Sequence, residues 1–298
     1  MIGSEQLVQL ILVGVTQGSI YALIALGFVT IYNVTGIINF AQGEFAMLGA
    51  MFMASLAPLA PLGLPMPVAF LLAVAAVVLV GGGIERLAIH PARRASVVTL
   101  IIITIGVDIV LRGLALLAWG TDPLPLAPFS SGPPVSVAGA VITRQALWIL
   151  GTTAVTLAGL YAFFEYTYLG KIVRACAINR LSARLSGIPP ERMSLFAFGL
   201  AAALGAVGGI VMGPLTLVSY DMGLYLGLRG FVAAVMGGLV SAPGAVVGAL
   251  LLGVLEALVA GIWKAAYKEA AAFLVLFLIL LVRPQGLFTR AVESRAGL

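Results

Sequence analysis

The chain has 298 residues, of which 62% are hydrophobic and only 9% are charged, and its formal net charge is +5. Soluble domains carry about 25% charged residues, so this composition excludes an ordinary soluble protein. One cysteine and one histidine exclude internal disulfides, cysteine-rich metal centres and multi-histidine proton relays. The apolar stretches are long and unbroken, unlike the short alternating strands of a membrane β-barrel. We therefore predict an all-α polytopic membrane protein.

Seven apolar stretches are long enough to cross a bilayer, which takes about 20 residues. An eighth apolar region, 230–262, is interrupted by GGLVSAPG at 237–244, and we expect it to form a broken, re-entrant element. No basic region precedes the first stretch, which predicts that this span is retained in the mature protein. The expected full spans are 7–32, 38–57, 66–88, 96–119, 146–165, 193–218 and 270–283.

Basic residues gather at three places, and loops rich in lysine and arginine usually face the cytosol. These places are a short loop at 86–94, a longer loop at 165–192, and the segment after the last span, which holds Arg283, Arg290 and Arg295. The positive charge thus reflects membrane topology, and no nucleic-acid partner is expected. The pattern predicts an external N-terminus and a cytosolic C-terminus. The loops expected outside are 58–65, 120–145 and 219–229.

Small residues recur four apart in three stretches, a spacing that lets helix backbones approach closely in lipid. The pattern indicates tight internal packing, and an interface between subunits is the alternative. The three sets are Gly14, Gly18 and Ala22; Gly205, Gly209 and Gly213; and Ala245, Ala249 and Gly253.

The stretch GIINFAQGEFAMLGAM (36–51) places Asn39, Gln42 and Glu44 within six residues, between two apolar stretches. Its glycines, Gly43 among them, each weaken a helix by about 1 kcal/mol relative to alanine. Non-helical backbone at membrane depth is tolerated where it packs in protein or lines a watery cavity. The stretch has no lysine or arginine, unlike the other expected inner loops. We expect Asn39, Gln42, Gly43 and Glu44 to border a translocation pathway, with an ordinary turn as the alternative.

Three further charged residues fall inside apolar stretches. Asp108 and Arg112 are four residues apart, which places them on one face of a helix where they can neutralise each other. We predict an intramembrane charge pair that fixes packing. Glu256 is expected to reach the outer membrane interface, and Glu44 could equally cap the helix that follows it, near the positive end of the helix dipole.

The run YALIALGFVTIYNVTGIINFAQGEFAMLGAM (21–51) closely resembles the start of the branched-chain amino acid permeases of bacterial ABC importers, the LivH/LivM type. That family typically has a tyrosine-alanine-leucine opening, followed by "NFAHGEF" and "MLGA". Gln42 stands where histidine is usual, which leaves the exact substrate open. The resemblance continues, in order, through RASVVTLIIITIGVDIVLRG, YTYLGKIVRACAINRLSARLSGI, VMGGLVSAPGAVVGALLLGVLEAL and RPQGLF, and covers nearly the whole chain.

The resemblance implies an ABC importer permease fold, with 1–298 forming one transmembrane domain in the bacterial plasma (inner) membrane. It also implies a complex with a second permease (a homologue or an identical copy), two cytosolic ABC ATPases and an external solute-binding protein. The implied cargo is a branched-chain or other small amino acid. The sequence contains no GxxxxGK[ST] phosphate loop, so the chain is expected to bind no cofactor and to leave ATP hydrolysis to its partners.

The basic loop 165–192 contains an apolar stripe at helical spacing, and a glycine and two prolines end the pattern. The segment is similar to the coupling helix of such importers, which implies that it docks onto an ATPase. A helix lying on the bilayer surface is the alternative. The residues assigned to docking are Ile178, Arg180, Leu181, Ala183, Arg184, Leu185, Gly187 and Ile188.

Two other classes of function fit less well. An ion-coupled secondary transporter, for small polar or amide solutes such as urea, would need paired carboxylates within spans, and only Glu44 and Asp108 qualify. An intramembrane enzyme would need a nucleophile beside a base, yet Cys176 and His90 both fall in expected cytosolic loops and no GxSxG sequence occurs. The sequence therefore favours a transport subunit without a catalytic or metal site.

Overall fold

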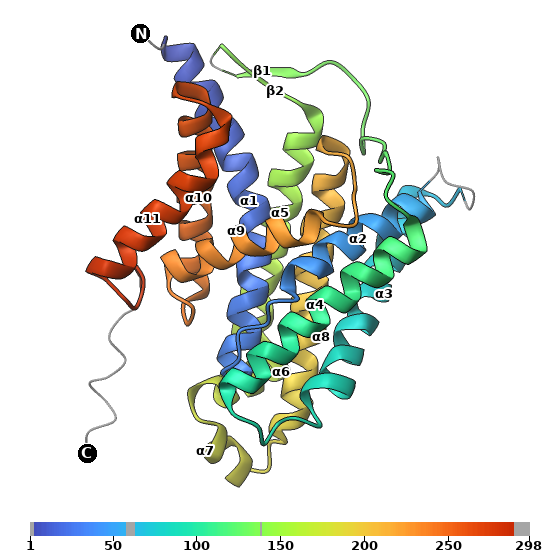
Figure 1. Ribbon diagram of the computed structural model, residues 1–298, viewed down its shortest axis with the longest axis vertical. Coiled ribbons are helices and arrows are strands. Elements are labelled where there is room, and N and C mark those ends of the chain that lie inside the picture. The colour runs from blue at the N-terminus through green and yellow to red at the C-terminus, as the bar shows by residue number, and fades with distance from the viewer. Residues whose placement is uncertain (1–2, 58–62, 138, 289–298) are drawn as a thin grey trace.

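The computed structural model describes residues 3–57, 63–137 and 139–288 (Figure 1). Arg290 and Arg295, which we counted among the basic residues of the cytosolic side, lie outside the described residues. Within the described part, helices dominate and two short strands form one hairpin.

The helices and strands follow each other along the chain in this order. They are α1 (Ser4–Thr35), α2 (Gln42–Leu56), α3 (Met66–Ile84), the π-helical turn η1 (Glu85–Ile89), α4 (Val97–Trp119), β1 (Val135–Val137), β2 (Ala140–Ile142), α5 (Arg144–Tyr166), α6 (Tyr168–Ile178), α7 (Arg180–Leu185), α8 (Pro190–Met212), the 3₁₀ turn η2 (Gly213–Leu215), α9 (Met222–Gly237), α10 (Ala242–Ile262), the 3₁₀ turn η3 (Ala265–Tyr267) and α11 (Lys268–Val282).

Among the described residues, seven helices are long and apolar enough to cross a membrane, which confirms the predicted number of spans. Their assignment differs at two places. The expected span 38–57 is the 15-residue α2, because residues 37–41 are not helical. The expected broken region is interrupted only at 238–241, so that α10 is a complete helix of 21 residues and α9 is the short one.

Helix α1 is the core of the bundle and packs most extensively against α10 (Figure 1). The two helices approach so closely that a side chain on Gly18 would lie 2.8 Å from the carbonyl oxygen of Ala249. A side chain on Gly14 would lie 2.9 Å from the carbonyl oxygen of Gly253. Two of the three sets of small residues therefore pack against each other inside the chain.

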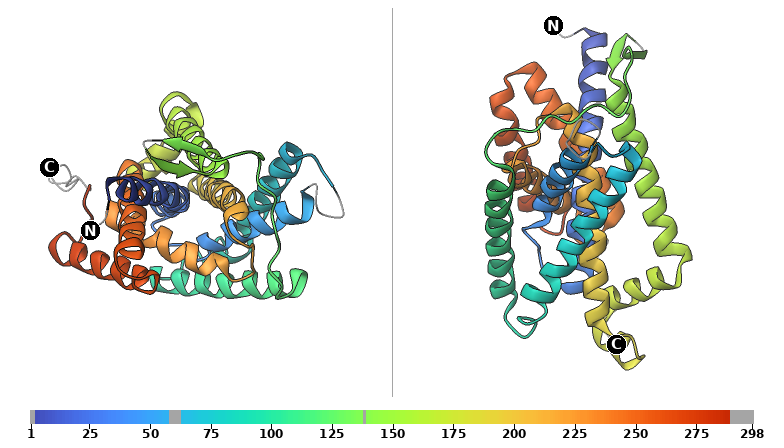
Figure 2. Two further views of the ribbon diagram at one scale, coloured as in Figure 1. Left: turned by 90° about the horizontal axis from the view of Figure 1, so that it is seen from above. Right: turned by 90° about the vertical axis from the view of Figure 1, so that its right-hand side faces the viewer.

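The start of α1 and helix α7 lie at opposite ends of the molecule (Figures 1 and 2). At the first end, β1 and β2 pair antiparallel with Val135 opposite Ile142. The Gln9 side chain binds this hairpin twice: its Nε2 donates to the Val141 oxygen at 3.0 Å, and its Oε1 accepts from the Val141 N–H at 2.7 Å. The hairpin thereby holds the first turns of α1.

Two short helices, α2 and α9, run obliquely across the bundle, and α4 and α11 lie at its edge (Figures 1 and 2). A side chain on Gly227 would lie 3.1 Å from the Gly43 Cα atom, so α2 and α9 contact each other through glycine backbone. In the most apolar 18-residue stretch of α4, 22% of the residues are buried, and in the stretch 265–282 that contains α11 only 6% are. Lipid or another subunit must cover their apolar faces.

Candidate functional site

A break in the helical backbone separates α1 from α2. Helix α1 ends at Gly36, whose φ of 73° is favourable for glycine and whose N–H donates to the Tyr32 oxygen at 2.7 Å. Beyond it, the Asn39 Oδ1 accepts from the Ala41 N–H at 3.3 Å. Asparagine offers the backbone this local partner in place of a helical one, which explains why the helix does not resume before Gln42.

Helix α4 holds the break in place through one side chain. The Phe40 N–H donates to the Thr104 hydroxyl at 3.2 Å, and Thr104 is fully buried. The same hydroxyl donates to the Ile101 oxygen of its own helix at 2.8 Å and lies 3.4 Å from the Ile38 oxygen. The non-helical backbone is thus packed within protein, one of the settings in which it is tolerated at membrane depth.

The first residues of α2 are fixed between α8 and α9. The fully buried Gln42 donates through Nε2 to the Ala201 oxygen of α8 at 3.0 Å. Gly43 packs directly on Gly223 and Gly227 of α9, where any larger residue would overlap the backbone. Helix α2 therefore starts at a point that three other helices determine.

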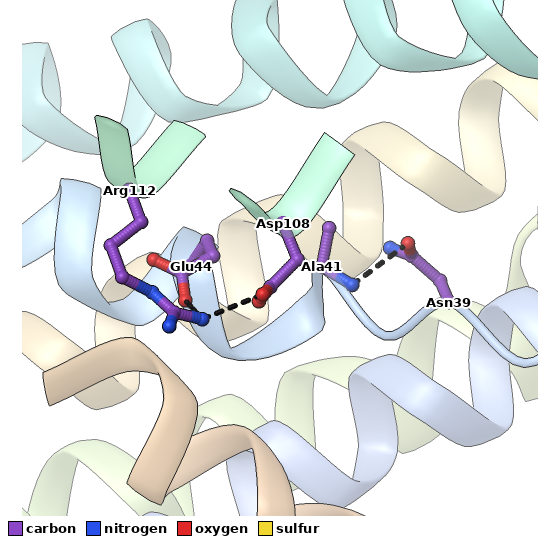
Figure 3. A network of polar contacts seen from close by, with 5 residues as sticks. All are labelled: Asn39, Ala41, Glu44, Asp108 and Arg112. Atoms are coloured by element: carbon purple, nitrogen blue, oxygen red, sulfur yellow. Dashed lines mark hydrogen bonds and ion pairs between the residues drawn. The ribbon is translucent and has the colours of Figure 1, made fainter. Parts of the chain in front are cut away.

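A charge network joins α2 to α4 (Figure 3). One nitrogen of Arg112, Nη2, lies 2.6 Å from Asp108 Oδ2 and 3.4 Å from Glu44 Oε1. The structure therefore brings Asp108 and Arg112 together at the expected i,i+4 spacing and adds Glu44, which the sequence did not link to them. Glu44 also sits in the first turn of α2, where the helix dipole favours a negative charge. We call Glu44, Asp108 and Arg112 the break cluster.

Polar atoms without a partner concentrate around this break. Buried polar groups in proteins are nearly always satisfied, if not by protein then by ordered water or a ligand. The part of the chain that the structure describes has six buried side-chain atoms without a hydrogen-bond partner, and four of them belong here. The break thus retains capacity for further polar partners. The four atoms are Asn39 Nδ2, Gln42 Oε1, Glu44 Oε2 and Arg112 Nε.

A second charge network joins α1, α9, α10 and α11, and sequence reasoning missed most of it. Arg229 Nε lies 3.3 Å from Glu256 Oε1, and Arg229 Nη2 lies 3.2 Å from Glu269 Oε1. The Tyr21 hydroxyl donates to Glu256 Oε2 at 2.8 Å, and the Arg229 guanidinium lies 5.9 Å from the centre of the Tyr21 ring. We call these four residues the clamp cluster.

The clamp cluster corrects two expectations. Glu256 does not reach the membrane interface, because it is fully buried between Tyr21 and Arg229. Arg229 does not belong to an outer loop at 219–229, because α9 already begins at Met222. The position of Arg229 directly before a long apolar stretch was the sequence signal that could have placed it in a helix.

The proposed docking segment contains a shorter helix than its pattern suggests. Helix α7 has six residues, and the Asn179 side chain caps it by accepting from the Ser182 N–H at 2.9 Å. Ile178, Leu181 and Leu185 are 80%, 68% and 82% exposed, so they form an uncovered apolar surface. The fourth residue of the expected stripe does not join them, because Ile188 packs against a small buried cluster.

The remaining assigned residues anchor α7 to the bundle or end it. Ala183 is buried, and its oxygen accepts from the Ile188 N–H at 3.0 Å. Arg180 donates through Nη1 to the Thr35 oxygen at the end of α1, at 3.2 Å. Gly187 has a φ of 81°, which ends the helix in a conformation suited to glycine. Arg184 lines a cavity beside α7.

These features define a class of protein: a polytopic membrane transport permease. Seven helices are long and apolar enough to cross a membrane, a polar break is buried within the bundle, and an uncovered apolar helix lies at one end. The chain belongs to the family described as "Branched-chain amino acid transport system / permease component", whose sequence model matches residues 10–282.

Individual relatives agree with this family. The chain is 35% identical to the high-affinity branched-chain amino acid transport system permease protein LivH of Escherichia coli, over 93% of this chain and 94% of LivH. It is 36% identical to the corresponding protein BraD of Pseudomonas aeruginosa, with the same coverage. Among solved structures, PsaBC from Streptococcus pneumoniae shares the fold, with a TM-score of 0.50, 13% identity, and coverage of 93% of this chain and 91% of that chain.

Proposed function

We propose that this chain is the membrane-spanning permease subunit of an ATP-driven importer that takes up branched-chain or other small amino acids. The observation that carries the proposal is similarity along 93% of the chain to LivH and BraD, which are named as branched-chain amino acid permeases. The break with its unpartnered polar atoms and the exposed apolar helix α7 are features that such a subunit needs.

The importer contains further subunits in this proposal. A second permease, homologous or identical, covers part of the exposed apolar surface, and two cytosolic ABC ATPases hydrolyse ATP. An external solute-binding protein delivers the cargo. Residues 1–298 act as one transmembrane domain, and 165–192 acts as the coupling loop.

The break between α1 and α2 borders the translocation pathway in this proposal. Asn39, Gln42, Gly43 and Glu44 fix the position of the break. The unpartnered atoms of the three polar side chains bind water or cargo when neighbouring helices move. All three polar side chains are fully buried in the present conformation, which supports a passage that is closed here. The external binding protein supplies affinity for the cargo, so a deep specific pocket in the membrane is not required.

The N-terminus lies outside and the C-terminus lies in the cytosol of a bacterial cell in this proposal. Cysteines placed at the exposed Ser131 and Lys171 should then react with membrane-impermeant thiol reagents from opposite sides. The native Cys176 is buried, and burial raises the pKa of its thiol, so its own reaction is slow. Reaction of both introduced cysteines from the same side would contradict this orientation.

The exposed face of α7 is where an ATPase binds in this proposal. We expect Leu185→Asp to prevent assembly, because a carboxylate in an apolar groove costs several kcal/mol unless it is paired. The matched control is Leu217→Asp, which changes a similarly exposed leucine (63%) in the loop that pairs with Leu124. Normal assembly of Leu185→Asp would show that the docking helix has been misplaced.

The experiment that tests the function is uptake of labelled leucine by proteoliposomes that contain this chain with its partner subunits. Uptake should require ATP on the cytosolic side of the importer and the binding protein on its external side. Uptake that follows a proton or sodium gradient without ATP would instead identify an ion-coupled secondary transporter.

A further inference from the structure

A cavity of about 610 Å³ opens at the end of the molecule that carries α7. Its walls come from four parts of the chain that are far apart in the sequence. They are the end of α1 with Ile37, the connection from α3 to α4 with the first turn of α4 (residues 85–100), helix α7, and the start of α8. Sequence reasoning did not connect the second of these parts to the docking segment.

The cavity is positively charged. Four arginines and two glutamates line it, which leaves a formal excess of two positive charges with His90 neutral. Arg180 is engaged with the Thr35 oxygen, and Arg93 is paired with Glu191 at 3.3 Å. In the described part of the chain, the side chains of Arg94 and Arg184 have neither a hydrogen bond nor an ion pair. Arg184 is close enough to Glu191 to interact with that carboxyl electrostatically, but both guanidinium groups keep their hydrogen-bond donors available to a ligand.

The cavity and the apolar surface of α7 are continuous. Leu181 lines the cavity and is also one of the three exposed apolar residues of the docking surface. Any protein that covers Leu181 and Leu185 must therefore also cover the mouth of the cavity. A guanidinium group that is covered in this way needs a partner, and carboxylates match its geometry through two parallel hydrogen bonds.

We propose that the cavity is a second contact for the ATPase subunit, and that this subunit inserts an acidic side chain between Arg94 and Arg184. The inference rests on the proposed function and extends it, because it adds the α3–α4 connection to a docking site otherwise confined to α7. The connection and α7 then bind the same partner from two sides. Movement of that partner acts directly on both α4 and α1.

The test measures binding of the purified ATPase to the permease complex in nanodiscs, with Arg94→Glu as the variant. We expect its dissociation constant to rise about tenfold or more at low salt, because one carboxylate then faces another. High salt should reduce the difference, since exposed charges are screened within about 10 Å at 0.1 M. The matched control is Arg283→Glu, which makes the same charge change at an exposed residue after α11, outside both the cavity and the coupling loop. It should alter binding by about twofold at most.

Cross-linking then identifies the partner residue. A cysteine at position 94 should form a cross-link to one acidic segment of the ATPase, and reversing that acidic residue to arginine should restore binding to Arg94→Glu. Equal effects of Arg94→Glu and Arg283→Glu would overturn the proposal. The proposal would also be overturned if Arg94→Glu lost binding to vesicles of anionic phospholipid but kept its affinity for the ATPase.

A failure of this inference can be distinguished from a failure of the proposed function. If leucine uptake depends on ATP and Leu185→Asp prevents assembly while Arg94→Glu binds normally, only this inference fails. If Leu185→Asp also assembles normally, the docking surface as a whole fails. Thermal unfolding of each permease variant in detergent shows whether a loss of binding reflects a loss of fold.

Discussion

The break cluster and the clamp cluster have the same charges but different surroundings. Each contains one arginine and two carboxylates on apolar helices, and in each the arginine lies within 3.4 Å of both carboxylates. The clamp cluster adds the Tyr21 hydroxyl and joins four helices. The break cluster joins only two helices and leaves two buried atoms, Glu44 Oε2 and Arg112 Nε, without a hydrogen-bond partner. In the clamp cluster Glu256 Oε1 alone lacks a hydrogen bond, and it still forms an ion pair with Arg229 Nε at 3.3 Å.

This difference suggests that one cluster stabilises the fold and the other belongs to a part of the protein that moves during transport. Buried charges in a membrane are costly unless they are paired or reach water. In the clamp cluster both carboxylates are paired with Arg229 within the protein, and the pair with Glu269 attaches α11, of which little else is buried. The break cluster leaves part of the requirement open at the point where the backbone is not helical. We therefore expect the clamp cluster to set stability and the break cluster to set the rate of transport.

The largest effect is expected from Arg229→Met. It leaves Glu256 buried without its cation, and breaking a buried ion pair in this way costs about 3–5 kcal/mol. The free energy of unfolding in detergent, measured with denaturant, checks this value. Lys264→Met, which removes an exposed cation nearby, should cost less than about 0.5 kcal/mol. Equal costs for the two variants would show that the clamp does not stabilise the fold.

Tyr21→Phe should have the next largest effect. It removes a hydrogen bond to a charged group, which contributes about 1.5–3 kcal/mol. The same unfolding measurement applies, with Tyr225→Phe as control because Tyr225 is half exposed. In an Arg229→Met background, the stability lost through Tyr21→Phe should differ from that in the unaltered protein, because Tyr21 and Arg229 both contact Glu256. Strict additivity would mean that the cluster does not act as a unit.

Gln42→Leu should slow uptake about tenfold, equivalent to about 1.4 kcal/mol in the barrier, while the complex still assembles. The substitution removes the donor to the Ala201 oxygen and the unpartnered Gln42 Oε1. Gln6→Leu changes an exposed glutamine at the start of α1 and should leave uptake unaltered. A cysteine at position 42 should react with a small thiol reagent at a rate that changes with ATP. If it stays inert in every nucleotide state, the pathway lies elsewhere.

Glu44→Gln should have the smallest effect, a reduction in uptake of about threefold or less. Glutamine keeps the shape of the side chain and can still accept a hydrogen bond from Arg112, while Asp108 keeps the arginine paired at 2.6 Å. Initial rates of uptake check this expectation. A complete loss of transport would show that the charge of Glu44 is itself required, and would favour the role of a charged group in the pathway.

Sequence alone predicted the features that depend on local spacing. The i,i+4 relation placed Asp108 and Arg112 together, and Gly36 with the polar residues after it indicated a break. Features that depend on the angle between helices were out of reach. The contact of Glu44 with Arg112 requires α2 to cross α4 at one height, and Arg229 meets Glu256 only because α9 is short and oblique. The start and middle of the 16-residue α9 contain three glycines and Arg229, a composition typical of a loop, which is why Arg229 was placed outside a helix.

The close packing of α1 on α10 has a consequence for synthesis of the protein. Tyr21 and Glu256 are separated by 235 residues, so the helix made first receives its main neighbour almost last. At ribosomal rates of about 5–20 residues per second, this interval is roughly 12 to 47 s. During it, α1 must reside in the membrane with Tyr21 unpaired and Gly14 and Gly18 uncovered. The mean hydropathy of 1.8 over its most apolar 18 residues keeps α1 there until α10 is made.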